Sequence, residues 1–398
     1  MVNIPLQLAA TALLGNLVNC YKLCHEYTIP VEVESEDFVL SIPPFQNNYD
    51  VADFVTNITR RGSATDFNPF AGSEKVTHAY NISATFCTPV DPRAKHRDTV
   101  ILATHGLNFD RQYWLPSFAP EQYSFADYAI ARGYSIFFYD RVGAGRSSIV
   151  SGFTNQLANQ VAVSLNISQE LRAGHYTGPI GVPKSLVLVG HSFGSSISSS
   201  TVAARPEICD ALVLTGMQFA VARWRLSQGG RWLTAFSGYS FNTSGQNGLG
   251  FIQSAQLRIA STVAPAASDW DELDTGYLTP VDVYSNVNTF FKKPDYDPAV
   301  AEAAYSRRQP LAFSEFLTFA SGNQAPVTFK GKAMVIAGQS DFIFCTGQCD
   351  GLIEHPAAEI FSNASSFRAV SYPHAGHALN FASNAAGAFR EIFDFLET

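Results

Sequence analysis

The stretch Leu186–Ser196, LVLVGHSFGSS, runs from four apolar residues into a serine, Ser192, that stands between two glycines. A continuous apolar run stopped by a glycine is typical of a strand buried in a parallel sheet. Pro206 marks the far end of a helix that begins just after Ser192. A serine on so sharp a strand-to-helix turn needs glycine at Gly190 and Gly194, because a Cβ there would collide with the neighbouring strand or helix. The pattern alone is common, so the surrounding sequence must decide its meaning.

The composition is that of a globular protein. The chain has 398 residues, of which 46% are hydrophobic and 15% charged, so it can bury a large core. The net charge of −8 is spread along the chain. The nearest approach to a basic run is Arg93, Lys95 and Arg97, which reads as a solvated loop and argues against nucleic-acid binding.

Apolar runs that end in glycine or a polar residue recur along the chain and alternate with helix-compatible segments. Strands are expected at 99–106, 134–140, 185–190, 210–216, 332–338 and 367–372, with helical segments at 124–132 and 154–172. Residues 27–98 read as strands and loops, interrupted by a short helix with Val51, Phe54, Val55 and Ile58 on one face. This alternation predicts an α/β fold with a mostly parallel central sheet flanked by helices.

The alternation of strands and helices stops between the strand that ends at Gly216 and the strand that begins at Lys332. This interval has the size of a small domain. We expect a core formed by 21–217 and 326–398, and an insertion, 218–325, over the edge of the sheet where such folds bind ligands. The insertion is rich in aromatic residues: Trp224, Trp232, Phe236, Tyr239, Trp270, Tyr277, Phe290 and Phe291. Its segment 298–320 has helix-like amphiphilic character. The aromatic residues fit either a hydrophobic ligand pocket or the insertion's own core, and we expect most of them to serve the core.

The first twenty residues carry no charge and include an apolar stretch from Leu6 to Val18. This stretch is too short to span a bilayer and suits a signal peptide at 1–20, with Val18 and Cys20 at the small-residue cleavage positions. An N-terminal amphiphilic helix is the alternative. Sites for N-glycosylation occur at Asn57, Asn81, Asn166, Asn242 and Asn363, and they favour secretion or the lumen of the secretory pathway.

The chain has six cysteines, and an even number fits disulfide bonds. They are Cys20, Cys24, Cys87, Cys209, Cys345 and Cys349. The segment CTGQC makes Cys345–Cys349 the best local candidate for a bridge, and free buried thiols in a cytosolic enzyme are the alternative. The chain has neither His-Glu-x-x-His nor a paired Cys-x-x-Cys, so the sequence predicts no metal site.

A serine nucleophile needs a base, and the base needs a third group to orient it. Asp341 follows the end of a predicted strand by three residues, and His377 follows the last predicted strand, where it is expected to open the final helix. Both positions lie at the carboxyl edge of the sheet, as Ser192 does, and the order serine, acid, histidine is that of one class of hydrolase. We therefore predict Ser192, Asp341 and His377 as the catalytic residues.

Other residues could take these roles. His374 lies in the same loop as His377 and is a second candidate base, which we rank below His377. Asp350 and Glu354 are weaker candidates for the acid, because both lie further from a strand end. The strand that ends at Gly216 is followed by MQFA and offers no carboxylate.

Acyl transfer also needs hydrogen-bond donors for an oxyanion. The backbone N–H of Phe193, directly after the serine, is one candidate. The other is the N–H of Leu107, after the tight turn His105–Gly106, with the Asn108 side chain as a helper.

Five segments resemble, in order, the signature segments of the α/β-hydrolase fold: THGLNFDRQYW, YDRVGAGRSS, GHSFGSS, AGQSD and AGHAL. The second resembles the family's Asp-x-x-Gly-x-Gly-x-Ser turn, with Asp140, Gly143, Gly145 and Ser147 in the matching positions. The resemblance covers about 95–218 and 326–398. It implies that the insertion is a lid, and within the family the chain looks most like a secreted fungal-type serine esterase or lipase.

The resemblance implies a serine hydrolase that cleaves a carboxylic ester or lactone of a hydrophobic small molecule without a cofactor. Ser192 stands where epoxide hydrolases and dehalogenases have aspartate, which argues against both activities. The sequence has no His-Gly-Gly-Gly segment, so specificity for esters of bulky tertiary alcohols gains no support. The alternatives are an acyltransferase, a thioesterase or lactonase of secondary metabolism, and a ligand-binding receptor on a hydrolase scaffold.

Overall fold

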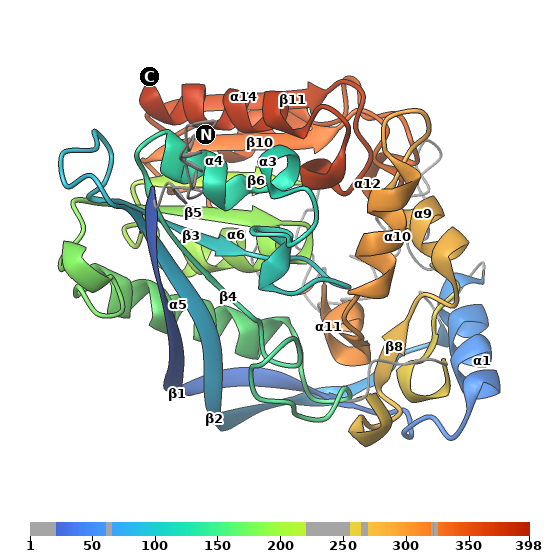
Figure 1. Ribbon diagram of the computed structural model, residues 1–398. Coiled ribbons are helices and arrows are strands. Elements are labelled where there is room, and N and C mark those ends of the chain that lie inside the picture. Colours follow the sequence, from blue (N-terminus) through green and yellow to red (C-terminus); the bar gives the residue numbers. More distant parts are fainter. Residues whose placement is uncertain (1–20, 61–65, 220–254, 264–269, 320, 322–324) are drawn as a thin grey trace, which may run out of the picture.

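The computed structural model describes residues 21–60, 66–219, 255–263, 270–319, 321 and 325–398. Its main sheet has eight strands in the order β1-β2-β4-β3-β5-β6-β10-β11 (Figure 1). Strands β1, β2 and β4 pair antiparallel, and all the other neighbours pair parallel. The strands are β1 Lys22–Leu40, β2 Phe70–Pro89, β3 Thr99–Thr104, β4 Ser135–Tyr139, β5 Ser185–His191, β6 Ala211–Thr215, β10 Lys332–Gly338 and β11 Ser366–Tyr372.

Helices follow the strands in the alternation that the sequence predicts. The helices of the core are α1 Asn48–Thr59, α3 Pro120–Tyr123, α4 Phe125–Ala131, α5 Leu157–Arg172, α6 Phe193–Ala204, α12 Phe342–Cys345, α13 Glu354–Ile360 and α14 Ala385–Glu397. Short 3-10 turns, η1 Arg111–Tyr113, η2 Gly178–Ile180 and η5 Leu379–Phe381, occur in the connections. The predicted α/β class and the predicted parallel strands are confirmed, with boundaries that differ by a residue or two.

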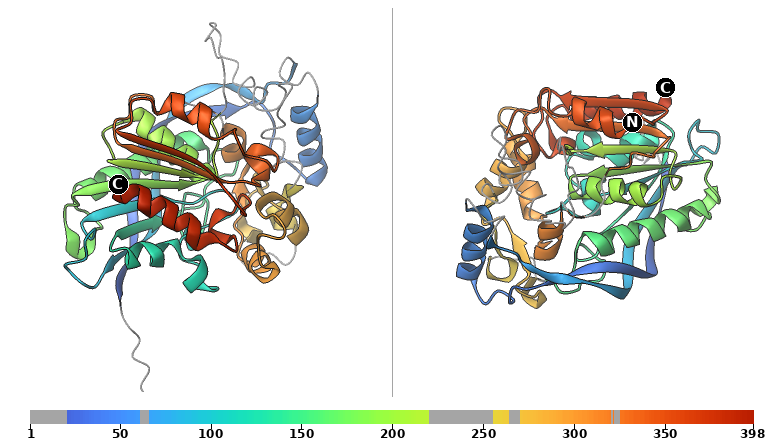
Figure 2. Two further views of the ribbon diagram at one scale, coloured as in Figure 1. Left: turned by 90° about the horizontal axis from the view of Figure 1, so that it is seen from above. Right: turned by 180° about the vertical axis from the view of Figure 1, so that it is seen from behind.

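The helices cover both faces of the sheet. Helices α5 and α6 pack on one face, and α4 and α14 on the other (Figure 2). Strand β5 is buried throughout, apart from its first residue, which explains its unbroken apolar sequence. In α14 the buried residues recur at helical spacing, at Ala385, Ala388, Phe389, Ile392 and Phe393, and form the face that meets the sheet.

A long antiparallel hairpin of β1 and β2 begins the described chain and reaches beyond the rest of the sheet (Figure 1). Helix α1 connects the two strands, with Val51, Phe54 and Ile58 buried on one face as the sequence predicts, while Val55 is only half-buried. The side chain of Asn48 accepts a hydrogen bond from the Ile259 N–H of the insertion. The far end of the hairpin therefore contacts the insertion.

The chain leaves the main sheet between β6 and β10. It forms a second sheet of β7 Arg258–Ile259, β8 Tyr277–Thr279 and β9 Leu311–Ala312, the turns η3 Ala260–Thr262 and η4 Trp270–Glu272, and helices α9 Val283–Phe290, α10 Pro298–Ser306 and α11 Phe313–Thr318. The amphiphilic segment 298–320 is thus not one helix. Pro310 lies in its interruption, and proline disfavours helix both at its own position and at the residue before it.

Some sequence predictions fall outside the described residues. These are the leader 1–20 with Cys20, the glycosylation site Asn242, and the aromatic residues Trp224, Trp232, Phe236 and Tyr239. Among the other predicted glycosylation sites, Asn57, Asn81 and Asn363 are exposed and Asn166 is half-buried.

Two disulfides occur in the described chain. Cys345 is bonded to Cys349, the pair that the local spacing favours. Cys24 is bonded to Cys87, a pair that the sequence does not single out, and the two residues lie directly opposite each other in the β1–β2 register. Cys209 is a buried free thiol.

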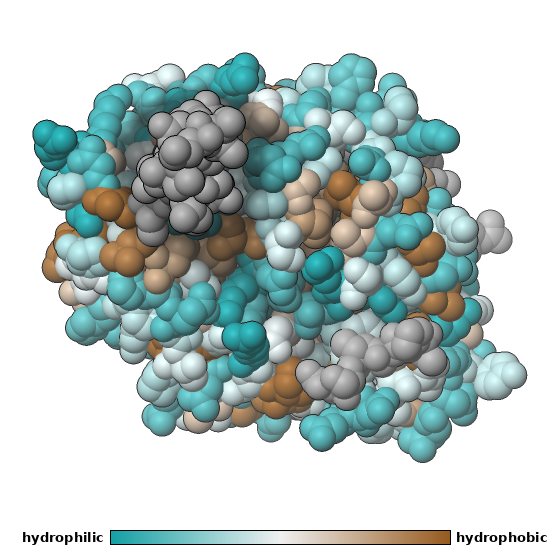
Figure 3. Space-filling view, viewed as in Figure 1, coloured by the Kyte–Doolittle hydropathy of each residue, from teal (hydrophilic) through white to brown (hydrophobic). Residues whose placement is uncertain are grey.

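On the face shown in Figure 3, hydrophobic residues lie in small groups among hydrophilic ones. Within the part of the chain that the structure describes, no helix is both long and apolar enough to cross a membrane.

Candidate active site

Ser192 lies between the end of β5 and the start of α6, with a backbone φ of 54° and ψ of −118°. This conformation is strained for a residue with a Cβ and is typical of a nucleophile turn. A Cβ on Gly190 would lie 2.4 Å from the carbonyl oxygen of Gly194, and one on Gly194 would lie 2.0 Å from that of Thr104. The predicted steric need for both glycines is therefore confirmed.

Asp341 and His377 meet in the interior at the carboxyl edge of the sheet. His377 Nδ1 lies 2.7 Å from Asp341 Oδ2, and both side chains are fully buried. The other carboxylate oxygen of Asp341 accepts a hydrogen bond from the Phe344 N–H at 3.0 Å, at the start of α12. The carboxylate is thereby fixed from two sides and orients the imidazole.

His377 also lies next to the Ser192 turn. Its ring centroid is 5.0 Å from that of His191, the residue before Ser192. A Cβ on Gly216, at the end of β6, would lie 3.3 Å from His377 Cε1. Within the described residues, His377 Nε2 is buried and has no hydrogen-bond partner, so it is not bonded to the Ser192 hydroxyl here. Such contacts often tighten only when substrate is bound.

The other candidates from the sequence lie elsewhere. The His374 side chain is 77% exposed and pairs with Asp295 at the surface. Asp350 is exposed and accepts hydrogen bonds from Ser371 and Gln339, which lower the pKa of its carboxyl below the ordinary value. Glu354 is half-buried at the start of α13.

The expectation that His377 opens the final helix is wrong. The turn η5 begins two residues after His377, and α14 begins only at Ala385. Within η5, Asn380 donates hydrogen bonds to the phenol oxygen and the carbonyl oxygen of Tyr113, and these contacts hold the 3-10 turn against η1.

The candidate oxyanion donors lie beside the serine. A Cβ on Gly106 would lie 3.0 Å from Ser192 Cβ, so the loop after β3 passes directly against the Ser192 turn. Phe193 is the first residue of α6, and its N–H therefore has no acceptor within the helix. The Asn108 Nδ2 donates one hydrogen bond to Asn286 Oδ1 of α9 at 2.9 Å.

Aromatic rings surround the histidine. Phe290 of α9 and Phe344 of α12 lie 5.8 Å and 5.7 Å from the His377 ring, measured between centroids. Tyr113 stacks on His191 at 4.3 Å. Burial, and then the nearby His377, lower the pKa of His191 well below its ordinary value, so this ring is neutral. Of the predicted aromatic residues of the insertion, Phe290 therefore borders the site, and Trp270 and Tyr277 pack within the insertion's own small core.

The Asp-x-x-Gly-x-Gly-x-Ser turn has a structural role. The Asp140 carboxylate accepts hydrogen bonds from the N–H groups of Arg111 and Arg146, and a Cβ on Gly145 would lie 2.3 Å from that carboxylate. The Ser147 hydroxyl donates to the Asp140 carbonyl oxygen at 2.6 Å. These contacts close the turn around Asp140.

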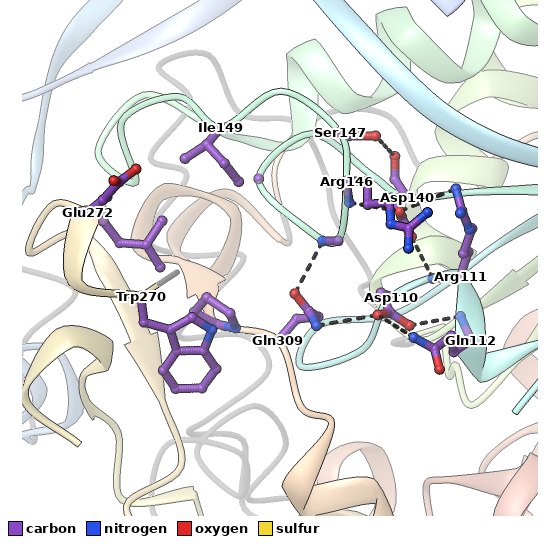
Figure 4. Close-up of a pocket in the computed structure, with 14 residues that line it drawn as sticks. Asp110, Arg111, Gln112, Asp140, Arg146, Ser147, Ile149, Trp270, Glu272 and Gln309 are labelled. Carbon is purple, nitrogen blue, oxygen red and sulfur yellow. Dashed lines mark hydrogen bonds and ion pairs between the residues drawn. The ribbon is translucent and has the colours of Figure 1, made fainter. Parts of the chain in front are cut away.

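This turn lines a cavity of about 810 Å³, which Trp270, Leu273 and Gln309 of the insertion also line (Figure 4). Burial, and then the nearby Asp140, raise the pKa of Asp110 in this cavity to about 7. A second cavity of about 680 Å³ lies between α9 and the loop after β10. Neither of these two cavities is lined by Ser192 or His377.

Sequence reasoning missed a buried polar cluster beside the loop that follows β3. Arg141 and Glu315 form an ion pair, and both residues are only 2% exposed. Gln160 Nε2 donates to the same Glu315 oxygen at 2.7 Å. The signal that could have found it is Glu315 itself, a single carboxylate within the apolar run LAFSEFLTFA.

Comparisons with known proteins identify the family. The model of the alpha/beta hydrolase family matches residues 100–391, so the chain belongs to that family. None of the curated proteins compared with the sequence matches it.

Solved structures share the fold at low sequence identity. A Mycobacterium tuberculosis protein is 14% identical with a TM-score of 0.51, and a thermophilic esterase from Thermogutta terrifontis is 14% identical with a TM-score of 0.50. Each comparison covers 80% of this chain and 94% of the other. An alpha/beta hydrolase fold protein from Chitinophaga pinensis is 13% identical with a TM-score of 0.48. That comparison also covers 80% of this chain and 94% of the other.

Proposed function

We propose that this protein is a serine hydrolase that cleaves a carboxylic ester or lactone of a hydrophobic small molecule through an acyl-enzyme. The observation that carries the proposal is the buried His377–Asp341 pair beside Ser192. An imidazole held by a carboxylate at Nδ1, with Nε2 left without a partner among the described residues, is suited to act as a base.

In the proposed first step the Ser192 oxygen attacks the substrate carbonyl while His377 Nε2 takes the hydroxyl proton. Asp341 stabilises the imidazolium that forms, and the N–H groups of Leu107 and Phe193 hold the oxyanion. The C–O bond to the alcohol then breaks, and His377 gives its proton to the leaving oxygen. Water repeats the cycle on the acyl-enzyme and releases the acid.

The surroundings of the histidine support a hydrophobic substrate class. Phe290 and Phe344 lie against the His377 ring and Tyr113 lies against the neighbouring His191 ring, and apolar pockets gain binding energy mainly from the burial of apolar surface. We propose that residues 218–325 act as a lid over this site, since Phe290 reaches the site from the insertion.

We further propose that the protein is secreted or lies in the secretory-pathway lumen. Two disulfides and three exposed candidate glycosylation sites support this, because disulfides persist in oxidising compartments.

Steady-state hydrolysis of p-nitrophenyl esters with acyl chains of increasing length tests the proposal. We expect Ser192→Ala to lose at least about 10³-fold in kcat. The matched control is Ser196→Ala, because Ser196 lies in the first turn of α6, which begins directly after Ser192, with a buried hydroxyl that has no hydrogen-bond partner among the described residues. Full activity of Ser192→Ala would overturn the proposal.

The histidines offer a second matched pair. We expect His377→Gln to lose most of its activity, and His374→Gln, altered at the exposed histidine, to keep it. Adding an alcohol acceptor separates hydrolysis from acyl transfer, since a transferase would form mainly the new ester while a hydrolase would release mainly the acid.

A further inference from the structure

The buried ion pair between Arg141 and Glu315 joins the two parts of the chain. Arg141 follows β4 in the core, and Glu315 lies on α11 of the insertion. Removing two charges from water costs free energy that the ion pair itself repays poorly, and an apolar pair of similar size is often at least as stable. A contribution to folding stability is therefore a weak explanation for the presence of this ion pair.

The guanidinium of Arg141 reaches both sides of the proposed oxyanion hole. Its Nη2 donates to the carbonyl oxygen of Gly106 at 3.3 Å, and its Cζ lies 4.9 Å from the centroid of the Phe193 ring. Phe193 supplies one of the proposed oxyanion donors through its N–H. Arg141 thus contacts the residues on either side of the site where the oxyanion would form.

A second donor acts on the same carbonyl oxygen. The Arg141 N–H lies 3.1 Å from His105 Nε2, and His105 Nδ1 lies 2.9 Å from the Gly106 oxygen. Burial lowers the pKa of His105 well below its ordinary value, so the ring carries a single proton. Because Nε2 accepts from a backbone N–H, that proton is on Nδ1 and is donated to Gly106.

The Gly106 carbonyl and the Leu107 N–H are the two ends of one planar peptide group. Fixing the oxygen therefore fixes the direction of the N–H, which points to the opposite side. Two donors on the oxygen also polarise the peptide and strengthen its N–H as a donor. A change in the direction or the donor strength of the Leu107 N–H would therefore mainly weaken the stabilisation of the transition state, in which the oxyanion carries its charge.

We propose that Arg141, held in place by Glu315 of the insertion, is a positioning residue of the oxyanion hole, so that the insertion completes the catalytic apparatus. This inference rests on the proposed serine-hydrolase function. It gives α11 a role beyond that of a lid element. The Glu315 carboxylate on α11 fixes the Arg141 guanidinium, which in turn fixes the orientation of the peptide group between Gly106 and Leu107 in the core.

The test compares Arg141→Lys and Glu315→Gln with the parent enzyme. Lysine keeps the charge but lacks the planar fork that contacts Glu315, Gly106 and the Phe193 ring together. Glutamine keeps the shape of Glu315 and removes its charge. The readouts are kcat per active site, counted by covalent titration of Ser192, KM for a small activated ester, and the affinity of a trifluoromethyl ketone that adds to the serine.

We expect Arg141→Lys to lower kcat per site about 10- to 100-fold and Glu315→Gln about tenfold, with KM changed less than about twofold, since removal of a whole oxyanion donor costs about 10²- to 10³-fold. The ketone, which forms an oxyanion in the same hole, should lose affinity in proportion to kcat/KM. The double variant should be no worse than Arg141→Lys, because both changes act through one contact.

The matched control is Arg308→Lys. Arg308 is also buried, and its side chain donates to Thr279 Oγ1 at 2.9 Å and stacks on Trp270, both within the insertion. It should lose stability while keeping kcat per site.

Unchanged kcat per site and unchanged ketone affinity in Arg141→Lys and Glu315→Gln would overturn the inference. If Arg141→Lys does not fold, Glu315→Gln decides by the same readouts. An active Ser192→Ala enzyme would instead overturn the proposed function, so the two failures can be told apart.

Discussion

The two disulfides should rank in opposite orders for their contributions to stability and to catalysis. Cys345–Cys349 closes the loop that leaves Asp341: the Asp341 carbonyl oxygen accepts hydrogen bonds from the N–H groups of Cys345 and Gly347, and the Cys349 N–H donates to Gln339. Cys24–Cys87 lies in the antiparallel hairpin at the other side of the sheet. The pairs of substitutions Cys345→Ala/Cys349→Ala and Cys24→Ala/Cys87→Ala each remove one bridge.

The magnitudes follow from the lengths of the loops. The sequence separations are 4 residues for the Cys345 bridge and 63 for the Cys24 bridge. If a disulfide acts by restricting the unfolded chain, the short loop contributes about 2 kcal/mol and the long loop about 4 kcal/mol. For a chain of this length these values correspond to roughly 2 and 5 °C in Tm.

Catalysis should rank the two variants in the reverse order. Without the Cys345 bridge, Asp341 is free to shift relative to His377, and small misplacements of catalytic groups cost rate steeply. We expect kcat per active site to fall about three- to tenfold. Removal of the Cys24 bridge should leave kcat per site unchanged.

Thermal unfolding and active-site-normalised ester hydrolysis measure both quantities on the same samples. A variant without the Cys345 bridge that keeps the full kcat per site would refute the reasoning. So would a loss of kcat in the variant without the Cys24 bridge.

Three further predictions follow from single features. Gly194→Ala should abolish ester hydrolysis, because its Cβ would lie 2.0 Å from the Thr104 carbonyl oxygen; a functional enzyme with this substitution would show that the turn can relax. Asp110, whose pKa is about 7 in the fold against about 4 in the unfolded chain, binds its proton more tightly when folded, so its contribution to stability is lost as the pH rises from about 4 to 7. Asp110→Asn should therefore be more stable than the parent by an amount that grows over that pH range, to at most about 4 kcal/mol in the free energy of unfolding, and its Tm should rise accordingly. A difference in Tm that does not change with pH would contradict this. Endoglycosidase treatment of protein from a eukaryotic host should increase its mobility on gels, and an unchanged mobility would argue against secretion.

The sequence predicts the core of the fold well because its signals are local. The strand before Ser192 is an unbroken apolar run, and the steric demands of Gly190 and Gly194 arise within a few residues of the turn. Asp341 and His377 could be placed at the same edge from sequence alone, since parallel strands bring their carboxyl ends together.

Features that depend on contacts between distant segments escape this reasoning. Arg141 and Glu315 are 174 positions apart, and only the packing of α11 against the core brings them together. The pairing of Cys24 with Cys87 depends on the register of a long hairpin, which no local turn signal fixes. The interrupted segment 298–320 shows the same limit, because β9 exists only by pairing with β8.

Covalent labelling of Ser192 tests the central claim most directly. The folded protein is treated with a fluorophosphonate, digested, and mapped by mass spectrometry. We predict one adduct per molecule on the peptide that contains Ser192, absent from Ser192→Ala and formed far more slowly in His377→Gln than in His374→Gln. No adduct on Ser192, or equal labelling rates in the two histidine variants, would contradict the assignment of Ser192 as a nucleophile activated by His377.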